Sequence, residues 1–512
     1  MIQVPAPIRL DEGNPPTGET ITEPSAYKTL TQLRQSFVGR LPDAPAGPCT
    51  SPAEIPPVKP APIAIMGIPF DNINSAQALQ AIDEMVASGG PHYLVTANVD
   101  FLVQAHEDVE LRRILVEADL VLCDGTPLVW VSRLLGNPLP ERVAGADLAP
   151  LLIELAAEKG HRLFLLGATE DSCSQAAANL QRQYPKLLIA GHYSPPFKQL
   201  LEMDHDEIVR RIQQAKPDLL LVSFGCPKQE KWIAMHYRAL GVPVCAGVGA
   251  TIDFLAGKVK RAPVWMRRSG LEWIFRLLQE PRRLFRRYAR DLWVFAGCIL
   301  KQWWQLQLCT HLRSNRSDAS DLSDLSDVQR NRDHRLLDLS HVKFLDSTSV
   351  GRLIRLRRDL RAKGNCLVLI ASRPAVRRAL SLVRLQEFFD YAPDHQSARR
   401  LIENRLSETS AAVITSRADP SAEHNLIWQG EVTAANAETV WESTHARLLL
   451  AARGRMVIDL SAVRFIDSSG LGLMVRARKL AQQSGINLIF TKPQTFVLNV
   501  IHIARLEELL LS

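Results

Sequence analysis

The sequence of 512 residues lacks several common signatures of metal-binding and nucleotide-binding sites. Its eight cysteines are scattered, with no C-x-x-C pair and no zinc-ligand spacing, which predicts reduced thiols that pack as small apolar side chains. The chain has no G-x-G-x-x-G at its first strand–helix unit and no G-x-x-x-x-G-K-[ST], so it lacks the phosphate cradles of dinucleotide dehydrogenases and P-loop enzymes. The only Asp-x-Asp triplet, at 204–206, opens a polar helical pattern, which argues against a metal site there.

Long apolar segments are also missing. The longest apolar run in the back half, Leu292 to Leu300, has nine residues, about half the length that a membrane-spanning helix needs. The N-terminus is polar and Pro-rich, without the pattern of a signal peptide. These features predict a cytoplasmic protein that contacts the inner face of the cell membrane without crossing it.

Positive charge is concentrated in one segment. Between Lys258 and Arg290 there are eleven Lys or Arg residues against two acids, Glu272 and Glu280. Such a block indicates a phosphate-bearing partner: a nucleotide, a nucleic acid or an anionic membrane. The segment has no nucleic-acid recognition motif, and its Trp-rich apolar face favours lipid, so we expect no nucleic-acid partner.

The fold class predicted for the chain is α/β. From Pro62 to about Ala262, apolar β-rich runs alternate with amphipathic stretches, which predicts a parallel sheet covered by helices on both faces. Composition divides the chain into a disordered Pro-rich leader (1–60), an α/β domain (61–264), a basic amphipathic helical appendage (265–312) and a Ser/Asp linker (313–334). Two smaller α/β segments follow, at 335–404 and 425–512.

Two strand-to-helix turns carry candidate functional residues. Asp124 ends an apolar strand, with Thr126 placed to cap the next helix and Pro127 suited to its first position. Ligands collect at the carboxyl ends of such strands, so Asp124 is either a catalytic carboxylate or a turn aspartate. Asn98 ends another strand, and by itself it is more often an N-cap than a ligand-binding residue.

Two later turns have the form of anion sites. Pro227 opens a helix whose first turn carries Gln229, where side chains are usually solvated but backbone amides also bind anions. Gly247 and Gly249 follow the next strand and permit a close approach of the backbone to a ligand.

Six stretches together resemble one enzyme family. "VTANVDF", "DGTPLVW", "ERVAGADL", "GCPKQEKWI", "GVGATIDFLAGKVKRAP" and "LEWIFRLLQEPRRLFRR" occur in the order found in WecG/TagA/CpsF glycosyltransferases, over about residues 63–287. The resemblance implies a modified α/β nucleotide-binding fold. It also implies transfer of a sugar, N-acetylmannosamine-type or glucose-type, from a UDP-sugar to a polyprenyl-diphosphate-linked saccharide with inversion, for surface polysaccharide synthesis.

The same resemblance assigns roles to individual residues. It implies that Asp124 is the general base and that Thr96 and Gln229 shape the donor site. Arginines of the appendage would close over the diphosphate, whose charge needs fixed cations if no metal is used. We therefore expect no cofactor and no metal, and a substrate-binding set of Thr96, Asn98, Gln229, Gly247, Gly249, Arg276, Arg283 and Arg286.

The helix that follows Pro281 has one apolar face. Its members recur at helical spacing: Leu284, Tyr288, Leu292, Phe295, Ile299, Trp303 and Leu306. Arginines crowd the first turns and three tryptophans lie further on, which suits a helix lying in a membrane surface. The alternative is a core helix packed on the sheet.

The C-terminal segments contain an internal duplication. "LLDLSHVKFLDSTSVG" and "VIDLSAVRFIDSSGLG" align without a gap at an offset of 121 residues. The second copy resembles the STAS domain of anti-sigma-factor antagonists, which implies that Ser468 is phosphorylated to control binding of a partner. Ser468 as a simple N-cap is the alternative. The first copy lacks the opening strands and helix, which makes a switch role for Ser347 doubtful, and we expect a neighbour or another chain to complete it.

The sequence thus predicts a glycosyltransferase with a STAS regulatory tail, whose partners are a UDP-sugar, a polyprenyl-linked acceptor, a membrane surface and a kinase or protein partner of the tail. Two alternatives remain open at this point. One is a non-catalytic nucleotide-binding scaffold, and the other is a regulatory protein of the anti-sigma-antagonist type.

Overall fold

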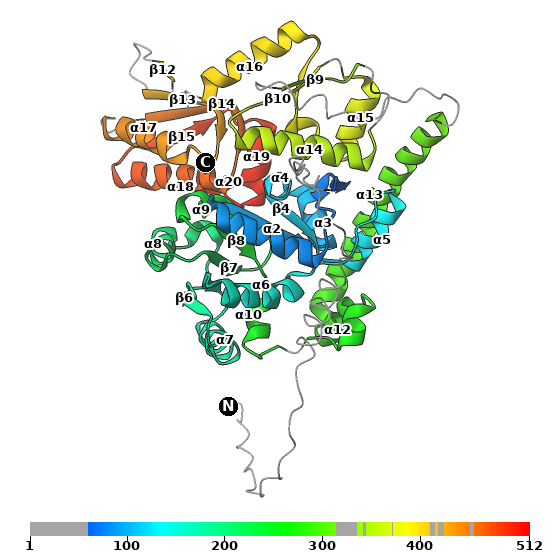
Figure 1. Cartoon of the computed structure of the whole chain (residues 1–512). Coiled ribbons are helices and arrows are strands. Elements are labelled where there is room, and N and C mark those ends of the chain that lie inside the picture. Colours follow the sequence, from blue (N-terminus) through cyan, green and yellow to red (C-terminus); the bar gives the residue numbers. More distant parts are fainter. Residues whose placement is uncertain are drawn as a thin grey trace, which may run out of the picture. The chain divides into compact units, whose positions relative to one another are not determined.

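A computed structural model describes residues 60–259, 261–313, 335–340, 342, 345–370, 372–409, 415–417, 424–450 and 455–511. The predicted leader (1–60) and linker (313–334) lie almost wholly outside these ranges. Within them the chain forms a large α/β domain and two smaller sheets with their own helices (Figure 1). The α/β fold class expected from the sequence is therefore confirmed.

The large domain is built on a six-stranded sheet in the order β4-β3-β8-β7-β5-β6, in which every pair of neighbours is parallel. All six carboxyl ends therefore lie along one edge. A short antiparallel hairpin precedes the sheet, formed by β1 (Ile63–Ile65) and β2 (Ile68–Phe70). The six strands are β3 (His92–Ala97), β4 (Leu120–Cys123), β5 (Arg162–Gly167), β6 (Leu188–Tyr193), β7 (Leu219–Ser223) and β8 (Val244–Gly247).

Both faces of this sheet are buried over its five strands other than the edge strand β6, because successive side chains along those strands alternate between two apolar clusters. One face packs against α2 (Ser75–Ser88), α6 (Gly145–Lys159), α7 (Glu170–Gln183) and α10 (Thr251–Leu255). The other packs against α3 (Val99–Glu107), α4 (Val109–Glu117), α5 (Thr126–Leu134), α8 (His205–Ala215) and α9 (Lys228–Leu240), with the short turn η1 (Leu200–Glu202) nearby.

The basic appendage consists of α11 (Val264–Arg268), α12 (Glu272–Gln279) and the long helix α13 (Pro281–Arg313). One stripe of α13, including Leu284, Phe295 and Ile299, is buried, and the latter two belong to the main core. The predicted apolar face was wrong at Leu292, which is 68% exposed, because Asp291 takes the buried position beside it. The core alternative thus holds for this stripe of the helix.

The first repeat forms a three-stranded parallel sheet in the order β11-β10-β9. Its helix α14 packs against β1 and β2, and a Cβ at Gly351 would lie 2.2 Å from the carbonyl oxygen of Pro62. The hairpin of the large domain therefore packs against the helix of this truncated copy, while the two hairpin strands form a sheet of their own. Its elements are β9 (Arg335–Asp338), α14 (Ser347–Ala362), β10 (Leu367–Ile370), α15 (Pro374–Leu382), η3 (Gln386–Phe388), β11 (Asp390–Ala392) and α16 (His395–Thr409).

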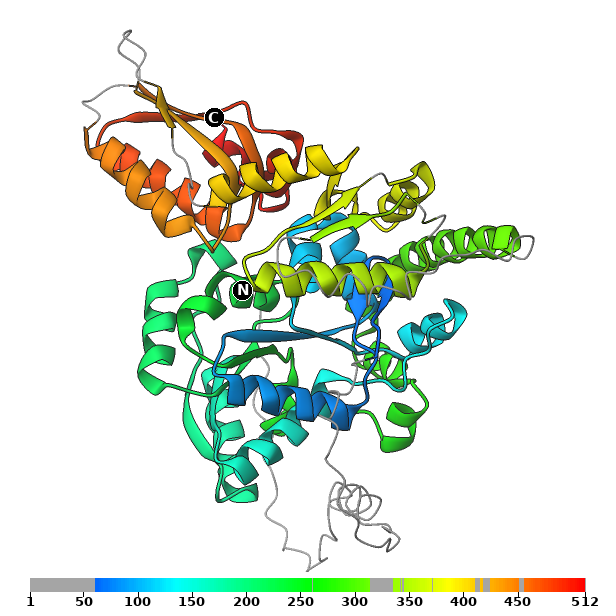
Figure 2. The ribbon, with the colours of Figure 1, turned by 45° about the horizontal axis from the view of Figure 1, so that its top comes forward.

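The second repeat has a sheet in the order β12-β13-β14-β15, in which only β12 is antiparallel to its neighbour. Helices α17 and α18 lie side by side against this sheet (Figure 2). Like α14, α18 has sixteen residues and begins after an aspartate N-cap. The elements are β12 (Thr415–Arg417), β13 (His424–Val432), α17 (Ala437–Leu450), β14 (Arg455–Ile466), α18 (Ser468–Gln483), β15 (Asn487–Thr491), α19 (Thr495–Ile503) and α20 (Glu507–Leu510).

Candidate functional site

The carboxyl ends of four adjacent strands, β4, β3, β8 and β7, carry the candidate residues of the large domain. Asp124 directly follows β4, and its backbone amide donates to the carbonyl oxygen of Ala97 at the end of β3, at 2.9 Å. Helix α5 then begins at Thr126 after Gly125, so the N-cap position predicted for Thr126 was wrong by one residue. The turn is held by the backbone, which leaves the Asp124 carboxylate to face the site.

The Asp124 carboxylate is in an environment that disfavours its charge. Burial raises its pKa to about 6, while Arg142, Arg276 and a hydrogen bond from the backbone amide of Gly145 act in the opposite direction. Glu272 raises it further. A carboxylate with a pKa near 6 is still ionised at neutral pH and is a stronger base than a solvated aspartate. The position thus combines a proton acceptor with nearby cations.

Thr96 and Asn98 flank this carboxylate from β3 and its following turn. Thr96 is buried, and a Cβ added to Gly145 would lie 2.7 Å from its hydroxyl oxygen, so the absence of a side chain at Gly145 makes room for it. Asn98 caps α3 by accepting a hydrogen bond from the amide of Phe101 at 3.2 Å. The N-cap interpretation of Asn98 is therefore confirmed, and no substrate contact is needed to explain the residue.

Gln229 joins two of the site's turns. Its side-chain oxygen accepts hydrogen bonds from the amides of Gly225 at 3.1 Å and Gly249 at 3.2 Å. Its amide nitrogen donates to Glu230 at 2.7 Å. A Cβ at Gly247 would lie 2.7 Å from that nitrogen, which explains the glycine. Gln229 is buried, so it shapes the site by fixing the two glycine turns.

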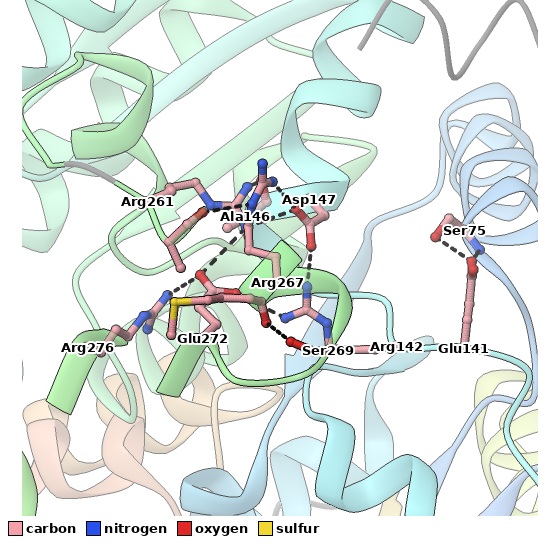
Figure 3. A network of polar contacts seen from close by, with 12 residues as sticks. Ser75, Glu141, Arg142, Ala146, Asp147, Arg261, Arg267, Ser269, Glu272 and Arg276 are labelled. Atoms are coloured by element: carbon pink, nitrogen blue, oxygen red, sulfur yellow. Dashed lines mark hydrogen bonds and ion pairs between the residues drawn. The ribbon is translucent and has the colours of Figure 1, made fainter. Parts of the chain in front are cut away.

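Figure 3 shows a network of arginines and carboxylates, three of whose members, Arg142, Arg276 and Glu272, act on the Asp124 carboxylate. It contains four guanidinium groups and two carboxylates, so positive charge is in excess. The ion pairs are Arg142–Asp147 at 2.7 Å, Arg142–Glu272 at 3.2 Å, Arg261–Asp147 at 2.9 Å, Arg261–Glu272 at 3.7 Å, Arg267–Asp147 at 3.4 Å and Arg276–Glu272 at 3.6 Å. These side chains come from α6, α11, α12 and the segments that precede α6 and α11, and they join the appendage to the end of the sheet.

Of the three appendage arginines that the sequence singled out, the structure brings only Arg276 to this network. Arg286 is exposed on α13, and the side chain of Arg283 lies outside the described residues. The sequence reasoning missed Arg142, Arg261 and Glu272. Arg142 stands in the "ERVAGADL" stretch, but nothing local to that stretch shows that it faces Asp124.

A second pairing that the sequence did not show ties α13 to the start of α3. Asp100 forms a two-pronged ion pair with Arg287, and the amide of Gln104 also donates to it at 2.6 Å. Asp291 is buried nearby, and burial followed by the charge of Asp100 raises its pKa to about 6. This acidic pair beside an arginine explains why the polar Asp291 occupies the buried stripe of α13.

The Asp-x-Asp triplet has a structural role at its first residue. Asp204 caps α8 by accepting from the amide of Glu207 at 3.1 Å. Among the residues that the structure describes, no group of three or more His, Cys, Asp or Glu side chains is placed to hold a metal ion.

Ser468 and Ser347 are the first residues of α18 and α14, and both side chains are buried. The N-cap alternative for Ser468 was wrong, because Asp467 is the cap and accepts from the amides of Ser469 and Gly470. The Ser347 hydroxyl instead accepts from the amide of Gln302 on α13 at 2.9 Å. The Ser347 side chain is thus enclosed against α13.

The face of α13 that does not pack on the core exposes large apolar side chains: Phe285, Leu292, Trp293, Leu300 and Trp304. Trp293 is 83% exposed, and Arg282, Arg286 and Arg290 are exposed on the same helix. Of the helices described, none combines the length and the apolar character that crossing a bilayer requires.

Two family models match different parts of the chain. The family model of the glycosyl transferase WecG/TagA/CpsF family matches residues 63–308, and the STAS domain model matches residues 308–398 and 426–511. An N-acetylglucosaminyldiphosphoundecaprenol N-acetyl-beta-D-mannosaminyltransferase of Staphylococcus aureus (strain MW2) is 32% identical over 228 residues, which cover 44% of this chain and 88% of that protein. The protein of the same name from strain NCTC 8325 / PS 47 matches to the same extent.

Proposed function

This chain belongs to the WecG/TagA/CpsF family of glycosyltransferases and carries STAS domains after its transferase domain, and we propose that it transfers a sugar from a UDP-sugar to a polyprenyl-diphosphate-linked saccharide with inversion of configuration. The observation that carries the proposal is the Asp124 carboxylate, whose pKa is raised to about 6 beside a cationic network. The names of the relatives suggest an N-acetylmannosamine donor and a GlcNAc-diphosphate-lipid acceptor.

The proposed reaction uses the site as follows. The acceptor hydroxyl oxygen attacks the anomeric carbon from the side opposite UDP, and its proton passes to the Asp124 carboxylate. The bond from the anomeric carbon to the diphosphate oxygen breaks, and its electron pair leaves with UDP. Arg142, Arg261, Arg267 and Arg276 supply fixed positive charge for the departing diphosphate, which is the largest electrostatic demand of the step. Gln229 holds the two glycine turns that would approach the nucleotide.

The test is transfer from a panel of UDP-sugars to a polyprenyl-diphosphate-GlcNAc analogue, in the presence of a chelator. We expect product from one donor with the wild-type chain and a loss of at least about a thousandfold with Asp124→Asn, as is typical when a general base is removed. UDP binding measured by calorimetry should be retained in that variant. Asp359→Asn, at an exposed position of α14, is the matched control. Transfer by Asp124→Asn at the wild-type rate would remove Asp124 from the mechanism, and UDP binding without any transfer would favour the scaffold alternative.

The exposed face of α13 supports a second part of the proposal, that the protein binds the cytoplasmic surface of the membrane that holds its acceptor. Apolar and aromatic side chains flanked by arginines can enter the headgroup region and pair with anionic lipid. Flotation with vesicles of phosphatidylglycerol and phosphatidylcholine should recover the wild-type chain. Leu292→Glu with Trp293→Glu should weaken recovery severalfold, because both side chains are exposed in this face. Equal flotation of this double variant, or no flotation of the wild type, would contradict the assignment.

We further propose that the C-terminal STAS domain regulates the enzyme and that Ser468 is its modification site. Its position at the start of α18 supports this, since a phosphoryl group there adds charge at the point where the domain meets its surroundings. Mass spectrometry of the chain purified from its source, with Ser347 as an internal comparison, tests the assignment. Phosphate found on Ser347 and not on Ser468 would overturn it.

A further inference from the structure

The start of α18 is buried against the transferase domain. Glu110 on α4 is 3% exposed, and its carboxylate accepts two hydrogen bonds from Ser468, one from the backbone amide at 2.5 Å and one from the hydroxyl at 2.8 Å. Ser468 itself is 5% exposed. This serine of the second repeat thus pairs with a residue 358 positions earlier in the chain.

The charge of Glu110 is balanced from two sides. Lys231 on α9 forms ion pairs with Glu110 at 2.8 Å and with Asp108, the N-cap of α4, at 2.7 Å. The N-terminal end of α18 adds the partial positive charge of its free amides. A buried carboxylate is tolerated only when its lone pairs and charge are matched in this way, so Ser468 and Lys231 both belong to its environment.

A second set of contacts joins helix α4 to the STAS sheet. Arg113, three residues further along α4, pairs with Glu431 of β13 at 2.6 Å and lies over the Phe465 ring at 4.0 Å. Arg361 of α14 also reaches Glu431, at 3.4 Å. Ion pairing and cation–π contact on one face of α4 give this surface a defined orientation.

We propose that the C-terminal STAS domain binds the transferase domain of its own chain, with Glu110 as the acidic ligand of Ser468 and of the α18 N-terminus. This inference does not depend on the proposed reaction. The carboxylates of Glu110, Asp108 and Asp467 already lie at this surface, with Lys231 pairing with the first two, so a further negative charge at Ser468 is repelled and releases the domain. A protein partner that uses the Ser468 face must compete with α4 for it.

When the STAS domain is bound to α4, its contacts lie close in the fold to the candidate catalytic site. Lys231 lies two residues after Gln229 in α9, and α3, which precedes α4, carries the Asp100 that pairs with Arg287 of α13. Release of the STAS domain removes the balancing contact from this end of α4 and α9. Helix α9 thus connects the Ser468 surface with the glycine turns, and α4 connects it through α3 with the appendage.

Hydrogen–deuterium exchange of the full chain, followed by mass spectrometry, tests the interaction without an activity assay. We expect Ser468→Asp to speed exchange by about tenfold or more in α4 and in the first turn of α18, as loss of charge-assisted hydrogen bonds implies. Peptides from β14 and β15 should stay protected, which shows that the STAS domain remains folded. The matched control is Ser484→Asp, at the exposed C-terminal end of α18, and it should leave α4 unchanged.

Two further variants change Glu110, the transferase-domain partner of Ser468. Glu110→Ala should speed exchange in the first turn of α18 although the STAS sequence is intact. Adding Glu110→Gln to Ser468→Asp should restore protection in α4, because the glutamine amide can donate to the new carboxylate. Unchanged exchange at α18 in Glu110→Ala, or no recovery in the double variant, would overturn the proposal. If Ser468→Asp also exposes β14 and β15, the Glu110→Ala result alone decides.

Discussion

The cost of holding Asp124 in its site can be measured as a pH-dependent difference in stability. The folded protein raises the pKa of this carboxylate from 3.8 to about 6. Below the lower value the group is protonated in both the folded and the unfolded chain, and it contributes no difference. As the pH rises to about 6, the unfolded chain ionises first, so folding loses free energy, and above that value the loss is constant.

Two units of pKa correspond to up to about 3 kcal/mol at pH 7.5, and the same relation gives about 1 kcal/mol at pH 4.5. Asp124→Asn removes this contribution while its side-chain oxygen can still accept from the Gly145 amide. We therefore expect the variant to be more stable than the wild type, with a difference that grows by about 2 kcal/mol between these pH values. Because only the growth is compared, constant effects of the new amide cancel.

Urea unfolding of both proteins at pH 4.5 and pH 7.5 provides the measurement. Asp359→Asn, on the exposed side of α14, should differ from the wild type by less than about 0.5 kcal/mol at either pH. A stability difference between Asp124→Asn and the wild type that is the same at both pH values would refute the reasoning. The carboxylate would then be solvated in the folded chain and would have no raised pKa to use as a base.

Three other outcomes follow from the described contacts. The value of kcat/KM for transfer should rise with pH and level off above about 6, because Asp124 accepts a proton only when ionised, and a flat profile from pH 5 to 8 would contradict this role. Gly247→Ala should weaken UDP binding about tenfold or more by displacing Gln229, with Gly297→Ala in open space on α13 as its control in calorimetry. Arg112→Met should lower the free energy of unfolding by about 3 kcal/mol, because the buried guanidinium donates to the carbonyls of Ala105, Met66 and Val383, and an unchanged urea midpoint would exclude that role.

Much of the fold could be read from local pattern. The alternation of apolar runs and amphipathic stretches was enough for the parallel sheet, and strand ends placed Asp124 and Asn98 at one edge because parallel strands share their direction. The helix that carries Gln229 begins at Lys228, one residue after the Pro227 at which the sequence predicted its start. These features depend on residues that are neighbours in sequence.

What the sequence did not show depends on distant pairs. Asp291 is buried on α13 because Asp100 and Arg287 face it, and a hydrophobic period favours Leu292 at that place instead. Arg142 is held in the site by its ion pair with Glu272, which lies 130 residues away in the sequence. The Ser468 hydroxyl has a partner, Glu110, in another domain. A buried polar pair of this kind does not change the hydrophobic periodicity of either segment, so neither segment alone predicts it.

The packing of the β1–β2 hairpin against α14 determines where the chain can be truncated. Ile63, Ile65, Leu353 and Leu380 belong to one continuous apolar cluster, and Arg112 and Gln302 tie the two sides together through backbone carbonyls and the Ser347 hydroxyl. A fragment ending after α13 would present that face to water and would tend to aggregate. The large domain therefore cannot be separated from the first repeat without exposing this face. A catalytic unit that can be purified on its own has to keep residues up to the end of α16.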